Sequence, residues 1–200
     1  MSPEFIKRLT EHTPSLIGLE QCRQASVMIP LIETRDGLQI VLEQRSSKLN
    51  HQPRDICLPG GAIELGETPQ QAAVREACEE LLIQPEQIEV FGLMDVLHTN
   101  TLMLYPYAAK LSAYAMTYSP AEVERVFCVP LSFFQTQEPE QYRINLPVHL
   151  PENFPLSRIV GGENYQWRER REDILFYQYQ DWTIWGITAK ILQSFAQITK

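Results

Sequence analysis

The alternation of apolar and polar positions predicts a chain that is rich in strands. Residues 25–34, rich in Val and Ile, and the alternating residues 38–44 are typical of two strands, and Asp36-Gly37 between them favours a hairpin. Other stretches have strand-like composition, at residues 62–64, 88–97, 102–115, 124–131 and 174–180. A short turn is expected near Phe133-Phe134.

Helical periodicity marks three further stretches, at residues 3–12, 68–83 and 183–198. The middle stretch is the clearest, because Thr68 suits the N-cap, Pro69 suits the first helical position and Pro85 stops the run. Its apolar side is formed by Ala73, Val74, Ala77, Cys78, Leu81 and Leu82. The last stretch predicts a closing helix with its Ile, Leu and Phe residues, from Ile184 to Ile198, mostly facing inward.

Two segments lack periodicity and predict irregular structure. Residues 46–57 form a long loop, which in a compact domain is more often functional than filler. Residues 136–173 predict a long connection or a hairpin arm that carries Arg168, Arg170 and Arg171. No flexible linker divides the chain, so a single α/β domain over residues 1–200 is expected.

Composition narrows the class of protein. Hydrophobic residues make up 44% and charged residues 21%, as in an ordinary globular domain. The net charge of −8 disfavours binding to nucleic acid or to anionic membranes. No apolar run is long enough to span a bilayer and no signal peptide is evident, so a cytoplasmic location is expected. The four cysteines form no CxxC pair and are expected to be small buried side chains, Cys78 above all.

The unusual chemistry lies on the helix predicted over residues 68–83. Glu76, Glu79 and Glu80 are spaced i, i+3 and i+4, so their carboxylates project from one face and repel one another. Arg75 alone cannot neutralise all three. A divalent cation would relieve the repulsion, and all-oxygen ligation favours Mg²⁺ or Mn²⁺. The alternative is a solvated acidic helix face.

The glycines and Glu67 before the helix favour the cation. Gly60-Gly61 permits a close backbone approach to a ligand, and Glu67 precedes the helix at a fixed distance. Together these residues resemble the box of the Nudix hydrolase family, with matches at Gly61, Glu67, Arg75, Glu76, Ala77, Glu79, Glu80 and Ile83. The departure is Leu82, where the family has the glycine that ends the helix.

The resemblance implies a fold, a reaction and a set of roles. The fold would be an α-β-α sandwich with a mixed sheet and a loop-helix-loop box over residues 61–83. The reaction would be hydrolysis of a nucleoside diphosphate linked to another group, a small-molecule nucleotide substrate, with no nucleic-acid or membrane partner. Metal ligands would be Glu76 and Glu80, with Glu79 as a further ligand or the residue that orients the water. Arg75 would hold the glutamates in register, and Glu67 would act from the second shell or as an outer ligand. Glu122 would complete the base, and His98 is an alternative.

A second resemblance, to coenzyme A pyrophosphatases, concerns residues 42–61. Leu42-Glu43-Gln44-Arg45-Ser46 and Leu58-Pro59-Gly60-Gly61 are similar to that subfamily's signature at the right separation. Within that signature this chain differs at three positions: Asn50 stands where the subfamily has arginine, Arg54 where it has glycine, and Leu58 where it has phenylalanine. The resemblance implies cleavage of coenzyme A or its derivatives to 3′,5′-ADP and 4′-phosphopantetheine.

On this reading the substrate would be bound by Arg45, Ser46, Arg54, Gly60 and Gly61, and arginines 168, 170 and 171 could reach in from the arm. Two alternatives stay open: a hydrolase of ADP-ribose or another nucleoside diphosphate sugar, and a sensor that binds a nucleotide without cleaving it. The sequence also leaves a homodimer open.

Overall fold

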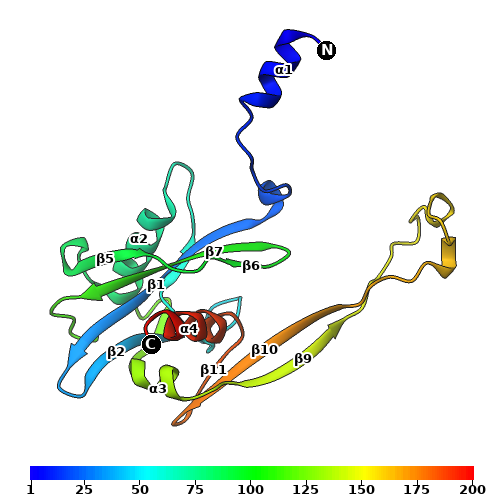
Figure 1. The fold of residues 1–200 in the computed structure, drawn as a ribbon. Coiled ribbons are helices and arrows are strands. Elements are labelled where there is room, and N and C mark those ends of the chain that lie inside the picture. The colour runs from blue at the N-terminus through cyan, green and yellow to red at the C-terminus, as the bar shows by residue number, and fades with distance from the viewer.

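A mixed β-sheet forms the centre of the computed structural model, which describes residues 1–200 apart from the side chain of Glu20 (Figure 1). Its main strands lie side by side in the order β3-β2-β1-β7-β5. β1 pairs in parallel with β7 and antiparallel with β2, which makes the sheet mixed. The strands are β1 Arg23–Thr34, β2 Gly37–Arg45, β3 Ile56–Cys57, β4 Gly60–Ala62, β5 Ile88–Leu93, β6 Leu97–His98, β7 Leu102–Leu111 and β8 Val123–Pro130.

The predicted hairpin at residues 25–44 is confirmed. Thr34 pairs with Gly37, and the Thr34 hydroxyl donates to the Gly37 carbonyl at 2.9 Å and accepts from the Asp36 N–H at 3.2 Å. Gly37 has a φ of 101°, a conformation that glycine adopts without steric cost. The hairpin places β2 beside β8, so that β2 becomes an interior strand.

Helices cover both faces of the sheet and complete the expected α-β-α sandwich. α2 (Pro69–Leu81) covers one face, while α3 (Leu131–Thr136) and α4 (Gly186–Ile198) cover the other. The alternation along β1 explains this arrangement, because Met28 packs with α2 and the next residue, Ile29, packs with α4. Both side chains are fully buried.

The box helix α2 begins as its sequence predicts. The Thr68 hydroxyl accepts from the Gln71 N–H at 3.3 Å, and the Gln71 side chain accepts from the Thr68 N–H at 2.9 Å, which forms a capping box. Pro69 follows at the first helical position. The helix ends at Leu82, which has left-handed φ and ψ of 52° and 49° although it is not a glycine.

Leu82 therefore carries backbone strain that a glycine would remove. Its side chain is 55% exposed, so little burial would be lost. We expect Leu82→Gly to raise the free energy of unfolding by about 1 kcal/mol, as measured by urea denaturation. Leu82→Ala is the matched control and should bring no comparable gain, because alanine keeps the Cβ that causes the strain. A glycine variant less stable than the parent would contradict this explanation.

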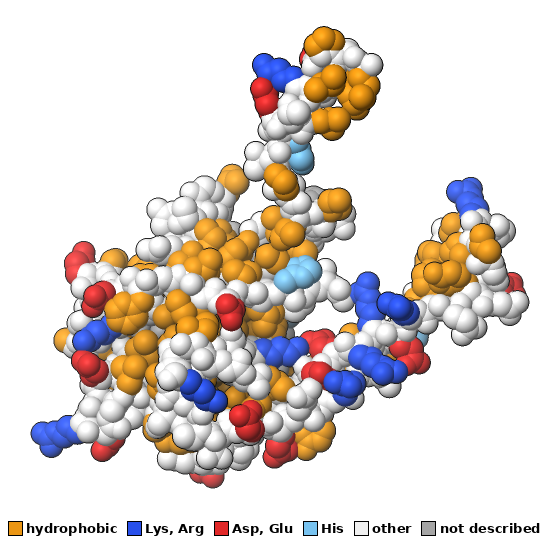
Figure 2. All heavy atoms as spheres, in the orientation of Figure 1, with side chains coloured by type: hydrophobic (Ala, Val, Ile, Leu, Met, Phe, Trp, Pro, Cys, Tyr) orange, Lys and Arg blue, Asp and Glu red, His pale blue; other side chains and the backbone are white. Residues whose placement is uncertain are grey.

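Residues 136–173 form the predicted arm. β9 (Glu140–Leu146) and β10 (Arg170–Tyr179) pair as a ribbon that extends away from the sandwich, and all of β9 is exposed (Figure 1). α1 (Pro3–Thr10) also stands apart from the sandwich, with the exposed apolar side chains of Phe5, Ile6 and Leu9. Figure 2 shows hydrophobic side chains gathered on α1 and at the tip of the arm.

Three expectations were wrong in detail. Residues 183–185 belong to strand β11 (Trp182–Trp185) and not to the closing helix, because a tight turn at Gln180, with φ of 52°, pairs this strand with β10. Phe133-Phe134 lies in helix α3 and not in a turn. Cys78 is only half-buried, since it lies at the edge of α2 near Pro85, and the other three cysteines have intermediate exposure as well.

None of the helices described is both long and apolar enough to cross a membrane.

Candidate active site

The two glycines of β4 bring the backbone close to β1 and α2. A Cβ on Gly60 would lie 2.3 Å from the Ser26 carbonyl oxygen, and Gly60 has a φ of 151°. A Cβ on Gly61 would lie 2.3 Å from Glu76 Oε1. The Gly60 N–H donates to Glu80 Oε2 at 2.7 Å. The glycines thus place the backbone directly against the carboxylates of the box helix.

Substitution of the two glycines should have different effects. Gly60→Ala forces a Cβ into the backbone of β1, so we expect the free energy of unfolding to fall by about 1–3 kcal/mol. Gly61→Ala meets only the end of the Glu76 side chain, so the fold should persist while kcat falls tenfold or more. Denaturation and steady-state assays of both variants test this. Equal losses of stability would contradict the distinction.

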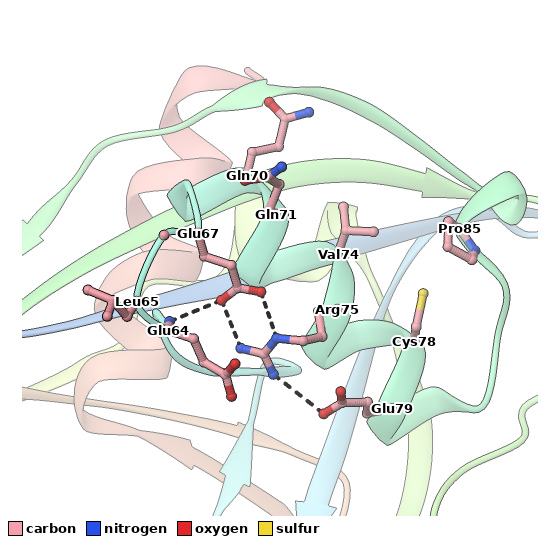
Figure 3. Close-up of a pocket in the computed structure, with 11 residues that line it drawn as sticks. Glu64, Leu65, Glu67, Gln70, Gln71, Val74, Arg75, Cys78, Glu79 and Pro85 are labelled. Carbon is pink, nitrogen blue, oxygen red and sulfur yellow. Dashed lines mark hydrogen bonds and ion pairs between the residues drawn. The ribbon is translucent and has the colours of Figure 1, made fainter.

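Arg75 connects the acidic residues of the box. Its guanidinium donates to both carboxylate oxygens of Glu67, at 2.7 and 3.1 Å, and to the Ala62 carbonyl at 3.1 Å. It also donates to Glu76 Oε1 at 2.9 Å and to Glu79 Oε2 at 3.4 Å, and Figure 3 shows its contacts with Glu67 and Glu79. These contacts lower the pKa of Glu67 and raise that of Arg75. Arg75 therefore fixes the loop before α2 and two box carboxylates in one geometry.

Two further carboxylates, those of Glu43 and Glu80, are buried, and their charges repel each other. Glu80 is 3% exposed, and burial followed by the charge of Glu43 raises its pKa to about 9. Glu43 is 1% exposed, and burial raises its pKa to about 7 against the opposing effects of Cys57 and Arg45. Burial also raises the pKa of Glu76. Glu79 differs, because its side chain is 55% exposed.

Glu43 is the residue that sequence reasoning missed. It lies on β2, where Ile40 and Leu42 face α4 and the alternate residues face α2. A glutamate at an inward position of an interior strand is rare unless it is paired or binds a ligand. That alternation, read together with the box, was the available signal.

The structure brings most of the predicted substrate residues near this cluster.

Other predicted residues lie elsewhere. The exposed Arg54 side chain is 3.8 Å from Glu124 and lines a hollow beside Trp182 and Trp185. His98 is exposed on β6, with Nε2 4.0 Å from Cys22 Sγ. Arginines 168, 170 and 171 are exposed at the base of the loop that ends the arm, which extends away from the sandwich (Figure 1). The arm therefore does not deliver them to the cluster of its own chain.

A groove of about 690 Å³ runs along the outer side of the Arg75 network (Figure 3). Its walls are the loop from Glu64 to Glu67, one side of α2 and Pro85. Glu79 and Arg75 line it, whereas Glu43, Glu76 and Glu80 do not. Arg75 thus lies between an open groove and the buried carboxylates.

The donor set fits a hard divalent cation. Glu43 and Glu80 offer buried carboxylate oxygens, Glu76 offers a partly buried carboxylate, and Glu43 Oε2 has no hydrogen-bond partner. Oxygen donors of this kind suit Mg²⁺ or Mn²⁺. Among the described residues no three acidic, cysteine or histidine side chains are already arranged as a set of metal ligands. Arg75 contacts Oε1 of Glu76 and the Gly60 N–H contacts Oε2 of Glu80, so the second oxygen of each carboxylate is the one that could bind an ion.

The fold and the site together define an α-β-α domain in which a glycine-flanked helix presents buried carboxylates. The family model described as "NUDIX domain" matches residues 23–145, more than half of the chain. The chain therefore belongs to the Nudix family. Both the predicted family and the predicted fold class are confirmed.

Individual proteins agree with this assignment. The chain is 30% identical over 198 residues to an uncharacterized Nudix hydrolase, NudL, of Citrobacter koseri, covering 96% of this chain and 92% of NudL. It is 35% identical over 112 residues to the peroxisomal coenzyme A diphosphatase NUDT7 of Mus musculus, covering 54% of this chain and 48% of that protein. A MutT/nudix family protein from Enterococcus faecalis shares the fold, with a TM-score of 0.55 at 17% identity over 100% of this chain and 70% of that one.

Not all relatives have the same length. The chain spans 53% and 59% of two Nudix hydrolases of Arabidopsis thaliana that it also matches.

Proposed function

We propose that this protein is a divalent-cation-dependent hydrolase of a nucleoside diphosphate derivative, with coenzyme A or its thioesters as substrate. The observation that carries the reaction class is the burial of Glu43 and Glu80, with the partly buried Glu76 as a third like charge, since a structure tolerates such like charges when a cation binds among them. When bound, the cation would neutralise charge on the diphosphate and make the attacking water more acidic.

The chain's own residues would position this chemistry. Arg75 keeps Glu67, Glu76 and Glu79 oriented, and the Gly60 N–H does the same for Glu80. Water attacks one phosphorus, the bridging P–O bond breaks and the leaving phosphate departs in line. Glu79 is the exposed member of the triplet and would be a further ligand, or would orient the attacking water and take up its proton.

Support for coenzyme A comes from residues outside the box. The Arg45-Ser46 pair and the run Leu58-Pro59-Gly60-Gly61 resemble the coenzyme A pyrophosphatase signature, and the mouse relative is named a coenzyme A diphosphatase. Arg45 Nε is buried without a hydrogen-bond partner, which leaves a cationic donor available to a phosphate oxygen next to the cluster.

A substrate panel tests this choice. Coenzyme A, acetyl-coenzyme A, ADP-ribose and a nucleoside diphosphate sugar are incubated with the full chain and Mg²⁺ or Mn²⁺, and products are identified by mass spectrometry. We expect the highest kcat/KM for the coenzyme A compounds, with 3′,5′-ADP and 4′-phosphopantetheine products. Faster turnover of ADP-ribose would show that the substrate is a nucleoside diphosphate sugar and not coenzyme A. Tight nucleotide binding without turnover of any compound would indicate a sensor.

A further inference from the structure

Among the described residues, two buried side-chain nitrogen or oxygen atoms lack a hydrogen-bond partner, and both belong to β2. They are Glu43 Oε2 and Arg45 Nε. These residues are two positions apart on one strand, so their side chains leave the same face of the sheet, the face that α2 covers. An unpartnered carboxylate oxygen in the interior costs free energy unless something binds it. Glu43 lies outside the Nudix box, so the box does not assign a role to this residue.

The contacts of Glu43 place its carboxylate beside the segment that also holds Glu80. Glu43 pairs with Cys57 across β2 and β3, and its Oε1 accepts from Cys57 Sγ at 3.4 Å. Three residues further along the chain, the Gly60 N–H donates to Glu80 Oε2. The two carboxylates therefore flank one short segment, Glu43 from the sheet and Glu80 from the helix.

The surroundings of Glu43 disfavour its ionised form. Burial and the charges of Glu122 and Glu76 raise its pKa, and the Cys57 thiol and the Arg45 guanidinium offset this only in part. No ion pair joins Glu43 to Arg45 in the part of the chain that the structure describes. Among the described residues Arg75 forms ion pairs with Glu67, Glu76 and Glu79, whereas the buried Glu43 and Glu80 have none.

We propose that Glu43 is a further ligand of the divalent cation, so that the metal centre spans α2 and β2 and is not confined to the Nudix box. This inference rests on the cation dependence in the proposed function, although not on the choice of substrate. A strand ligand would fix the ion against the sheet, while the helix ligands remain those that the box supplies. It also gives Glu43 Oε2 the partner that it otherwise lacks.

Binding of Mn²⁺ to the full chain at pH 7.5, measured by calorimetry and by the electron paramagnetic resonance signal of free Mn²⁺, tests the proposal without an activity assay. We expect Glu43→Gln to weaken Mn²⁺ binding tenfold or more. The metal-free melting temperature should not fall, because the variant removes a repelled charge and keeps the shape. Glu89→Gln, an exposed glutamate on β5, is the matched control and should bind Mn²⁺ like the parent.

The outcomes separate this inference from the proposed function. If Glu43→Gln binds Mn²⁺ within twofold of the parent while Glu80→Gln is impaired, Glu43 is structural and the inference is wrong, although the metal centre stands. If the parent itself binds no Mn²⁺, both fail. Should Glu43→Gln not fold, Glu43→Asp keeps the charge and withdraws the carboxylate by one methylene. Weakened Mn²⁺ binding by that folded variant supports the ligand role, and unchanged binding overturns it.

Discussion

Glu80→Gln should abolish turnover while leaving the fold intact. Glu80 is buried, accepts from the Gly60 N–H and is repelled by the charge of Glu43. Because water does not solvate its carboxylate, a bound cation would stabilise the ionised form. Loss of a metal ligand removes several kcal/mol of transition-state stabilisation, and we expect kcat to fall at least about 10³-fold. Glutamine keeps an oxygen that can accept from the Gly60 N–H. The measurement is kcat with saturating Mg²⁺ and substrate.

The matched control is Glu86→Gln, an exposed glutamate in the turn after the box, which should keep the parent kcat. Circular dichroism and the melting temperature should show both variants folded. An unchanged kcat for Glu80→Gln would exclude Glu80 from the metal centre and with it the assignment of roles in the box.

The second large effect is a loss of stability of the metal-free protein as the pH rises. Burial holds the pKa of Glu43 at about 7 and that of Glu80 at about 9, whereas both titrate near 4.5 in the unfolded chain. Between these values the folded state binds more protons than the unfolded state, so the free energy of unfolding decreases with pH. The loss should amount to a few kcal/mol between about pH 5 and pH 9. Urea denaturation in EDTA at several pH values measures it.

Divalent cations should reverse this trend. The ionised carboxylates bind the cation, so stabilisation by Mg²⁺ or Mn²⁺ should grow as the pH rises. The double variant Glu43→Gln, Glu80→Gln should show a flatter pH dependence in EDTA. A free energy of unfolding that is constant or rises from pH 5 to pH 9 in EDTA would contradict the burial of these charges.

The fold was largely predictable because its elements carry local signals. Thr68 and Pro69 mark the start of α2, and Asp36-Gly37 marks the hairpin, and both are confirmed. Residues 183–185 were predicted as helix because Ile184, Ile187 and Ile191 continue a helical period, although Thr, Ile and Trp favour strands. The pairing of β11 with β10 depends on a turn with left-handed backbone at Gln180, and a glutamine does not predict such a turn.

The candidate site was predictable in its box and not beyond it. The spacing of Glu76, Glu79 and Glu80 is local, and one helix presents them all. The position of Glu43 depends on which face of β2 meets α2, a fact of tertiary structure. The direction of the arm is equally non-local, and the structure carries Arg168, Arg170 and Arg171 away from the cluster.

Anomalous diffraction from crystals soaked in Mn²⁺ tests the central claim most directly, because it locates the ion itself. The account predicts an anomalous peak within about 2.2 Å of carboxylate oxygens of Glu76 and Glu80. A peak confined to other acidic residues, or no peak at saturating Mn²⁺ with these carboxylates unchanged, would contradict it.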